Sequence, residues 1–529
     1  MGRGTALVLL AVMSIGAFLS GLELMITAVA LPAIVVDLAD WTQLRPASWI
    51  INGYLLVSIV VMPLAGQLSD RYGIRRVFLW ALAVFIAGSI LAGRSTTLAE
   101  LIAARLFQAV GGGALVPVAT AAASHVFQGE GARARSLGVV GALTFLGMAA
   151  GPFAGAWILQ SIHPGGALDA LRLTGGVRDA LEDPWRYVFY LNVPIGLATL
   201  ALGWAATAGW SLPRRETRLD LAGAAFVSIG LAALLVGITL AGSEPIPGLP
   251  VDSPVLAAAL GALAALFLAL ALWIGTRRED PFIDPSWFRA PGFSSAAIVS
   301  LLTGYGFATA IIGGAVFVDR VLYGGPDLQR IALGSLAAAT AVGALASGLV
   351  LRALGLRLTT VAGLAAAIVG LIRMAAWTPE TEIGEVALWL ALFGLGFGLT
   401  VTPRSAAAVA ALGDRAYGIA SATVTVAREI GMAIGLATLT AFGSTIIDQL
   451  WAEVTATPDA YKAYIPATLQ DRPFNDGLVV AALEQWASGE AAQILVGVFL
   501  VAAAVMAVAV LPALRYGARR RPPEGAAPA

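Results

Sequence analysis

The sequence predicts an all-α polytopic membrane protein built from a duplicated helical bundle. Hydrophobic residues make up 59% of its 529 residues and charged residues only 12%, and the mean hydropathy is +0.85. Because so few charges could not cover a water-facing surface, an ordinary soluble domain is excluded. Two further observations define the spans and their duplication: a series of long apolar runs, and a charged segment that occurs twice.

Apolar runs predict the transmembrane helices. A helix needs about 20 apolar residues to cross a bilayer, and we count fourteen runs near or above this length. They lie at residues 7–36, 48–68, 76–94, 99–125, 134–161, 186–208, 219–241, 254–274, 292–319, 330–350, 358–376, 385–411, 417–447 and 493–514. The first run lacks a convincing small-residue cleavage site, so we expect it to remain as a helix and not to be removed as a signal peptide.

The distribution of arginine predicts the orientation. Loops after even-numbered runs, together with the two tails, carry most of the arginines, whereas loops after odd-numbered runs carry most of the acids. Since basic residues concentrate on the cytoplasmic side of membrane proteins, we expect both termini in the cytoplasm. The expected location is the plasma membrane of a prokaryote.

The charged segment between the second and third runs contains Gly66, Asp70, Arg71, Gly73 and Arg75. Its glycines allow a turn or a close backbone approach, and its charges suit a cytoplasmic loop. A weaker copy places Gly348, Arg352, Gly355 and Arg357 at the offsets of Gly66, Asp70, Gly73 and Arg75. A chain that uses the same connection twice is predicted to be a duplicated bundle.

The repeat divides the spans into six, two and six. The predicted parts are an N-terminal six-helix bundle at 1–210, a linker with two extra transmembrane helices at 211–290, a C-terminal six-helix bundle at 291–515 with a long extracytoplasmic segment at 448–492, and a cytoplasmic tail at 516–529. The two extra helices are expected to form an inserted hairpin.

The composition argues against several kinds of chemistry. There are no cysteines, and the two histidines, His125 and His163, lie far apart in the sequence. Disulfides and thiolate catalysis are therefore excluded, and neither a metal site nor a cofactor is expected. An intramembrane enzyme would need a nucleophile with a base or a cluster of metal ligands, so we predict that the protein is not an enzyme. We expect no nucleic-acid partner and a monomeric state.

Glu23 is an acid inside the first apolar run. An ionised carboxylate at bilayer depth costs about 2.5 to 3.5 kcal/mol or more, so such a residue persists where it is paired, faces a water-filled cavity or binds a proton. The structural alternative is a neutral acid that makes an interhelical hydrogen bond.

Arg105 is a cation inside the fourth run. A buried guanidinium needs an acceptor, and the acid of this run within reach is Glu100 at its outer end. We therefore expect a partner on another helix or on the backbone, unless Arg105 extends to the outer interface.

Two further runs carry unusual residues. In the fifth run Gly147, Gly151, Pro152 and Gly155 form a small-residue face that permits close packing or bending. In the thirteenth run Arg428 and Glu429 are adjacent. Neighbouring residues point about 100° apart on a helix, so we expect these two not to pair with each other and one of them to have a partner elsewhere.

The charged segment resembles the signature loop between helices 2 and 3 of the major facilitator superfamily, G-x-L-x-D-R-x-G-x-R. The resemblance implies two six-helix bundles related by pseudo-two-fold symmetry. It also implies a conformational latch formed by Gly66, Asp70, Arg71, Gly73 and Arg75.

Other motifs are similar to those of the fourteen-helix drug:proton antiporter family within that superfamily. They are Glu23 and its neighbours, Arg105 and its neighbours, the pattern G-x-x-x-G-P-x-x-G at Gly147, Gly151, Pro152 and Gly155, and a W-R-Y-x-F-x-x-N-x-P-x-G run that begins at Trp185. The resemblance implies proton coupling through Glu23 and Arg105, with Arg428 and Glu429 as candidates in the second half. We interpret the Trp185 run as an interface anchor and not as chemistry.

Parts of the chain are also similar to the mycobacterial triacylglyceride exporters of the superfamily. They are the segment 43–56, the segment 418–437 and the long outer segment before the last run. Phe145 is a departure from that subgroup, because an acid is expected at its place in the fifth run.

We therefore predict a proton-coupled secondary active exporter, an antiporter that moves hydrophobic or amphipathic compounds by alternating access. The alternative function is export of a triacylglyceride-like lipid to the outer face of the membrane, and a non-transporting scaffold is a third hypothesis. The predicted partners are the transported compound, protons and membrane lipids, with an extracytoplasmic lipid-carrier protein as a further candidate.

The outer segment 448–492 separates the two substrate classes. Leu450, Trp451 and Val454 continue one helical stripe beyond the thirteenth run, and Leu483 and Trp486 belong to another before the last run. Such stripes would shield lipid chains, of which each CH2 group costs about 0.8 kcal/mol in water, or would dock a lipid carrier. The alternative is that they only pack two helical extensions together.

Overall fold

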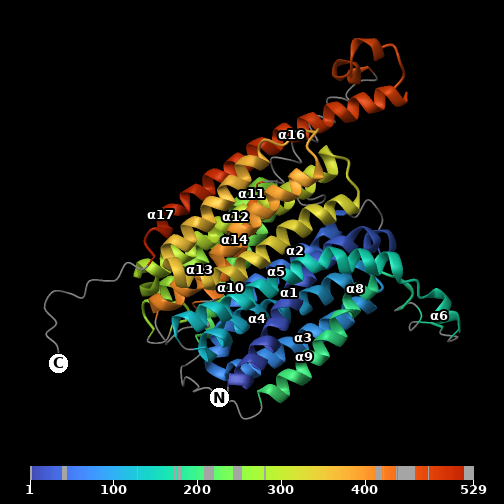
Figure 1. The fold of residues 1–529 in the computed structure, drawn as a ribbon. Helices are drawn as coiled ribbons and strands as arrows, with labels where there is room; N and C mark the ends of the chain where they lie inside the picture. Colours follow the sequence, from blue (N-terminus) through green and yellow to red (C-terminus); the bar gives the residue numbers. More distant parts are fainter. Residues whose placement is uncertain are drawn as a thin grey trace, which may run out of the picture.

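The computed structural model describes all residues except 1–2, 39–43, 128, 171–173, 176–177, 179–180, 208–219, 242–252, 279–280, 413–419, 421, 437, 439–458, 475 and 517–529. Within the described residues every regular element is helical, and the long helices lie side by side in one bundle (Figure 1). The predicted all-α architecture is confirmed.

The N-terminal half contains the helices that the first six apolar runs predict. They are α1 (Arg3–Leu38), α2 (Leu44–Tyr72), α3 (Ile74–Arg94), α4 (Leu98–Val126), α5 (Glu130–Ser161) and the consecutive pair α8 (Arg186–Tyr190) and α9 (Asn192–Ala206). A short helix, α6 (Gly165–Ala170), lies in the connection between α5 and α8.

The remaining elements follow the later runs. They are α10 (Leu221–Ala241), α11 (Ser253–Gly275), a 3₁₀ turn (Pro285–Arg289), α12 (Pro291–Val316) with a π turn (Phe317–Val321), α13 (Pro326–Met374), α14 (Ile383–Leu412), 3₁₀ turns at Ala460–Tyr464 and Ala467–Leu469, α16 (Gly477–Val508) and α17 (Val510–Ala513). Residues 422–436 are helical too.

Eleven helices in the described part of the chain are long and apolar enough to cross a membrane. One of them is the 48-residue stretch Asp327–Met374, which contains two of the predicted runs, and α10 contributes a shorter apolar stretch, Ala222–Ile238. The expected total of fourteen spans stays a prediction.

The two copies of the charged segment build the same kind of turn. Between α2 and α3, Gly73 has a φ of 91°. At the equivalent place in the second copy, Gly355 has a φ of 77° and interrupts the helical geometry of α13. Glycine adopts a positive φ without the steric cost that other residues meet, so the repeated glycine accounts for the repeated turn.

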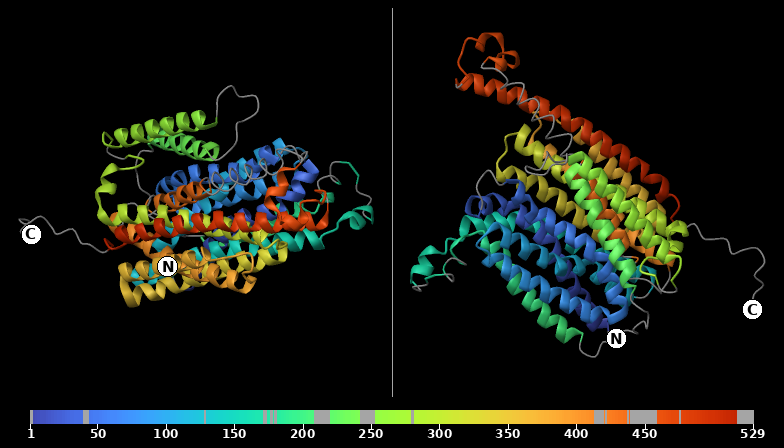
Figure 2. Two further views of the ribbon diagram at one scale, coloured as in Figure 1. Left: turned by 90° about the horizontal axis from the view of Figure 1, so that it is seen from above. Right: turned by 180° about the vertical axis from the view of Figure 1, so that it is seen from behind.

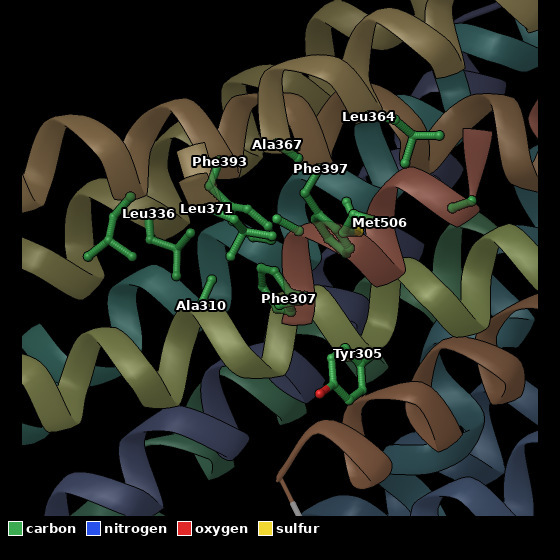
Figure 3. Close-up of a cluster of buried hydrophobic side chains, with 14 of the residues drawn as sticks. Tyr305, Phe307, Ala310, Leu336, Leu364, Ala367, Leu371, Phe393, Phe397 and Met506 are labelled. Atoms are coloured by element: carbon green, nitrogen blue, oxygen red, sulfur yellow. The ribbon is translucent and has the colours of Figure 1, made fainter. Parts of the chain in front are cut away.

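An aromatic cluster joins the two halves of the chain. Phe307 on α12 stacks on Phe397 of α14 with ring centroids 4.3 Å apart, and Figure 3 shows the two rings inside the buried core. Phe145 on α5 meets both rings edge to face, with centroids 5.5 Å and 5.4 Å away. The phenylalanine that departs from the lipid-exporter pattern is therefore an N-terminal side chain buried in the C-terminal core.

The helices α10 and α11 pack against each other beside the bundle (Figure 2). Val227 and Leu231 of α10 belong to one buried apolar cluster with Met62 of α2 and Val426 of the helix 422–436. The pair of helices thus contacts both halves of the chain through apolar side chains.

Asp220 fixes the base of this helix pair. Its carboxylate accepts hydrogen bonds from the backbone N–H of Gly223 at 2.8 Å and of Phe282 at 3.1 Å, and it forms an ion pair with Arg278. The start of α10 is thereby tied to the segment that leads into α12.

The last long helix extends past the bundle (Figure 1). The 32 residues of α16 span about 48 Å at 1.5 Å per residue, whereas a bilayer core is about 30 Å thick. Asp476 caps the projecting end by accepting the N–H of Leu478 at 2.9 Å, and this hydrogen bond holds the pKa of that carboxyl below its usual range. The sequence predicted a helix that projects beyond the bilayer, and α16 has the length for it.

Candidate functional site

Glu23 on α1 and Arg105 on α4 form a buried ion pair. Arg105 Nη1 donates to Glu23 Oε1, and neither side chain is more than 1% exposed. The same guanidinium donates to Gln108 Oε1 at 2.6 Å and to the carbonyl oxygen of Ile50 at 3.3 Å. The expected partners for Arg105, another helix and the backbone, are both present, and the guanidinium does not extend to the interface.

Further polar side chains complete the network around Glu23. Asn192 at the start of α9 donates from Nδ2 to Glu23 Oε2, and Thr27 Oγ1 lies 3.1 Å from Glu23 Oε1. Gln108 continues the network to Ser89 on α3 through a bond of 2.8 Å. Both carboxylate oxygens are therefore satisfied, and the network joins helices that are far apart in the sequence.

Aromatic rings enclose the guanidinium of Arg105. Its Cζ lies 4.2 Å from the ring centroid of Tyr54 on α2 and 5.5 Å from that of Phe189 on α8. Such rings hold a cation while excluding water. A proton bound by Glu23 would remove the charge that Arg105 pairs with, so one protonation event would change the contacts between α1, α4 and α9.

The second-half candidates pair with each other, and our expectation that they would not is wrong. Arg428 Nη2 donates to Glu429 Oε1, with Nε of Arg428 at 3.2 Å from the same oxygen. Adjacent Cβ atoms do point apart, but the long arginine side chain reaches around the helix to its neighbour. Arg428 also lies over the ring of Phe145, with its Cζ 5.8 Å from the centroid.

Arg404 on α14 is a buried cation that the sequence analysis missed. Its Nε donates to the carbonyl oxygen of Thr400, one turn earlier, at 3.0 Å, and Nη1 donates to Thr303 Oγ1 on α12. Its Cζ lies 5.1 Å from the ring centroid of Phe397. No ion pair involving Arg404 occurs among the described residues.

Comparison with known proteins identifies the family. The model of the family described as Major Facilitator Superfamily matches residues 13–436. The chain belongs to the Major Facilitator Superfamily.

Relatives within the superfamily cover most of the chain. A triacylglyceride transporter of Mycolicibacterium smegmatis is 30% identical over 492 residues, which are 89% of this chain and 81% of the relative. Multidrug resistance protein 3 of Bacillus subtilis is 27% identical over 436 residues, 81% of this chain and 77% of the relative. The predicted similarity to the superfamily and to mycobacterial triacylglyceride transporters is confirmed.

Solved structures of the superfamily share the fold. A bacterial homologue of the human lysosomal transporter Spinster, in an inward-facing conformation, superposes with a TM-score of 0.58 at 16% identity, over 99% of this chain and 100% of the other. A proton:xylose symporter gives the same TM-score at 12% identity, over 96% of each chain. As the sequence predicted, the protein is a multi-pass membrane transporter and not an enzyme.

The residues of the superfamily's signature loop lie at the turn between α2 and α3. They are Gly66, Asp70 and Arg71 at the end of α2, Gly73 at the turn and Arg75 in the first turn of α3. Arg75 Nε donates to Thr207 Oγ1 beyond the end of α9 at 2.9 Å, and its Cζ lies 5.2 Å from the ring centroid of Trp204. These contacts of Arg75 stay within the N-terminal half. The latch role stays a prediction.

The glycines of the α5 motif lie against α1. A Cβ at Gly147 would lie 2.1 Å from the carbonyl oxygen of Phe18, and one at Gly151 would lie 2.7 Å from the Cβ of Met25. Gly155 also faces α1, and Pro152 lies inside α5. The expected close packing is present, whereas the antiporter role of the motif stays a prediction.

The outer stripes are only partly described. Leu450, Trp451 and Val454 lie outside the described residues. Leu483 is buried, and the ring of Trp486 lies 4.5 Å from that of Tyr464, so both pack on the 3₁₀ turns of their own segment. The exposed apolar side chains here are those of Phe474, Leu478 and Val480.

Three residues of the candidate site escaped the sequence analysis as chemical groups. Asn192 lies in the Trp185 run, which we interpreted as an anchor, yet it binds Glu23. Tyr54 lies in the segment 43–56 that resembles the triacylglyceride exporters, but nothing in that resemblance assigned it a contact with Arg105. Arg404 lies in the twelfth apolar run as Arg105 lies in the fourth. A guanidinium inside either run needs an acceptor, so Arg404 was recognisable as a candidate from the sequence.

Proposed function

We propose that the protein is a proton-coupled exporter, an antiporter that moves hydrophobic or amphipathic compounds across the plasma membrane by alternating access between two six-helix halves. The observation that carries the proposal is the enclosed pair of Glu23 and Arg105. A buried ion pair adds little net stability on its own, so its retention in a membrane interior favours a role in proton binding.

The proton cycle follows from the contacts of Glu23. When Glu23 is ionised, its two oxygens hold α1 to Arg105 of α4 and to Asn192 of α9. When it is protonated, the ion pair is lost and these helices can rearrange. A membrane potential supplies about 2.3 kcal/mol per charge per 100 mV, which is sufficient to drive accumulation of the exported compound by order tens of fold per proton.

The proposal includes fourteen spans, with α10 and α11 as an inserted hairpin and both termini in the cytoplasm. It also assigns the latch to Asp70 and its neighbours. If Asp70 holds one access state, Asp70→Asn shifts the inward/outward population by about 1 kcal/mol without impairing insertion. Single cysteines placed at the two mouths report this shift, since the chain contains none. Equal labelling in mutant and parent would rule out the latch.

The test of proton coupling uses proteoliposomes with an imposed pH gradient and an internal pH dye. We expect a hydrophobic dye such as Hoechst 33342 to move against the proton flux. Glu23→Gln should abolish gradient-driven export but keep the energy-independent exchange of dye across the membrane, which shows that the protein is folded. The control variant is Asp319→Asn in the π turn that follows α12, where the side chain is exposed. Gradient-driven export by this variant should be unchanged. Unaltered export by Glu23→Gln would refute the assignment.

Lipid export is the second candidate function. It is supported by the similarity to proteins named triacylglyceride transporters and by the exposed Phe474 and Leu478 at the projecting end of α16. Replacing residues 452–484 with a Gly/Ser linker should then abolish transfer of a fluorescent triacylglycerol while sparing dye export. Loss of both activities, or of neither, would argue against this role.

A further inference from the structure

Arg404 differs from the other buried arginines because it has no acidic partner among the residues that the structure describes. Arg105 pairs with Glu23, and Arg186 pairs with Asp183 and Asp37. Arg404 is 2% exposed, and its hydrogen-bond partners among the described residues are the Thr400 carbonyl and the Thr303 hydroxyl. A guanidinium has five N–H donors, and these two hydrogen bonds use two of them.

The charges of the C-terminal core do not balance. The described charged side chains that lie inside it are Arg404, Arg428 and Glu429, and Glu429 is already paired with Arg428. Arg428 also lies within electrostatic range of Arg404 and repels it. Within the described part of the chain one positive charge therefore has no counter-ion, whereas the pair Glu23–Arg105 of the N-terminal half is neutral. A buried charge is costly unless an anion joins it.

Two further buried hydroxyl groups of the C-terminal core lack partners among the described residues. The Tyr516 hydroxyl is buried within electrostatic range of Arg404, and it makes no hydrogen bond in the described structure. The Ser300 hydroxyl, one turn from Thr303 on α12, is also buried and without a partner there. Buried polar groups of proteins are normally satisfied, so these donors point to a group that joins them in another state.

The surroundings of Arg404 are apolar and lie where the two halves meet. Its guanidinium lies over Phe397, which contacts Phe145 of α5. Phe397 also stacks on Phe307 of α12 (Figure 3). When the halves separate during transport, the contact of Phe145 with these rings must open together with the other contacts of α5 on α13 and α14. A cation at the base of an aromatic surface suits a molecule with an anionic end and a hydrophobic body.

We infer that Arg404, with Thr303 and Tyr516, binds the anionic head group of an amphiphilic substrate, a carboxylate or a phosphate ester, whose tail lies on the rings of Phe397 and Phe307. The inference rests on the proposed function, since it names the chemical class of its substrate. The planar guanidinium can hold either head group through two parallel hydrogen bonds.

Binding to the purified full-length protein tests this inference without any proton gradient. The probes share one tail: dodecanoate, dodecyl phosphate and dodecanol, with inorganic phosphate as the head group alone. In nanodiscs of zwitterionic lipid, we expect one or both anionic probes to bind, and Arg404→Gln to weaken that binding about 10- to 100-fold, the effect of a charged hydrogen bond. Dodecanol should bind equally to both proteins.

Two variants act as controls. Arg320→Gln removes an exposed arginine in the π turn Phe317–Val321 that follows α12. This change should leave anion binding unchanged. Arg404→Lys keeps the positive charge but loses the planar guanidinium, so it should bind the anionic probes with intermediate affinity. If Arg404→Gln does not fold, the affinity of Arg404→Lys tests the inference in its place. The tighter of the two anionic probes identifies the head group.

The inference is overturned if Arg404→Gln weakens dodecanol as much as the anionic probes, if Arg320→Gln has the same effect, or if inorganic phosphate binds as tightly as dodecyl phosphate. Failure of the proton-coupling test is a separate result. Dye export that does not depend on Glu23 would refute the proposed coupling, and binding of an anion at Arg404 would still stand.

Discussion

Removing the charged groups of the Glu23–Arg105 pair, singly and together, tests whether they act as one unit. In Glu23→Met the guanidinium of Arg105 keeps Gln108 and a backbone carbonyl but loses its counter-ion. In Arg105→Met the carboxylate keeps Asn192 and Thr27. Glu23→Met leaves an unpaired buried guanidinium, and Arg105→Met leaves a carboxyl group that must stay unpaired or take up a proton. Breaking a buried pair in this way costs about 3–5 kcal/mol.

The double variant should behave differently. With both charges replaced by apolar side chains of similar length, no unpaired charge remains, and such a replacement is often close to neutral in stability. We therefore expect Glu23→Met with Arg105→Met to be more stable than either single variant, with a coupling energy of about 3 kcal/mol or more. Gradient-driven export should be lost in all three.

The measurement is the apparent free energy of unfolding, from titration with sodium dodecyl sulfate in mixed micelles and followed by circular dichroism. The exposed pair Asp319–Arg320, with an N···O distance of 3.1 Å and side chains 50% and 70% exposed, is the control cycle. Its coupling should be below about 1 kcal/mol. Additive losses in the buried cycle would refute the claim that the two residues compensate each other.

Three further changes test the packing. Gly147→Ala places a methyl group 2.1 Å from a backbone oxygen of α1, so it should lower stability by about 1–3 kcal/mol, whereas Gly497→Ala, with no atom within 4 Å, should not change the apparent melting temperature. Phe145→Ala removes two edge-to-face contacts between the halves and should cost about 3–5 kcal/mol; an unchanged melting temperature would show that the aromatic cluster does not hold the halves together. In Gly73→Ala the added methyl group meets open space, but the residue keeps a φ of 91°. Backbone strain alone should therefore lower the free energy of unfolding by about 1–2 kcal/mol. A decrease below about 0.3 kcal/mol in the same titration would mean that the turn relaxes to another φ.

Helix positions were predictable because a bilayer imposes a simple length rule. Apolar runs at 76–94 and 99–125 became α3 and α4 within two residues at each end. The repeated turn was predictable as well, because a positive φ favours glycine, and glycine stands at both positions, Gly73 and Gly355. These features depend on residues near one another in the sequence.

Pairing across the bundle was less predictable. The sequence showed that Arg105 needs an acceptor on another helix, but the choice of Glu23 and Asn192, which lie 82 residues before it and 87 after it, depends on helix rotation and tilt that no local pattern records. The error at Arg428 and Glu429 had a different source. The directions of the Cβ atoms do not include the reach of an arginine side chain, which has four rotatable bonds.

The helix pair α10–α11 has a mechanical consequence. Its base is fixed by directional bonds from Asp220, while the length of α10 contacts Met62 on one half and Val426 on the other through apolar side chains. Dispersion contacts are individually weak and non-directional, whereas the hydrogen bonds of Asp220 are directional. If the two halves rock against each other as proposed, the apolar length of α10 is the part of the pair that can shift, and its base is the part that stays fixed.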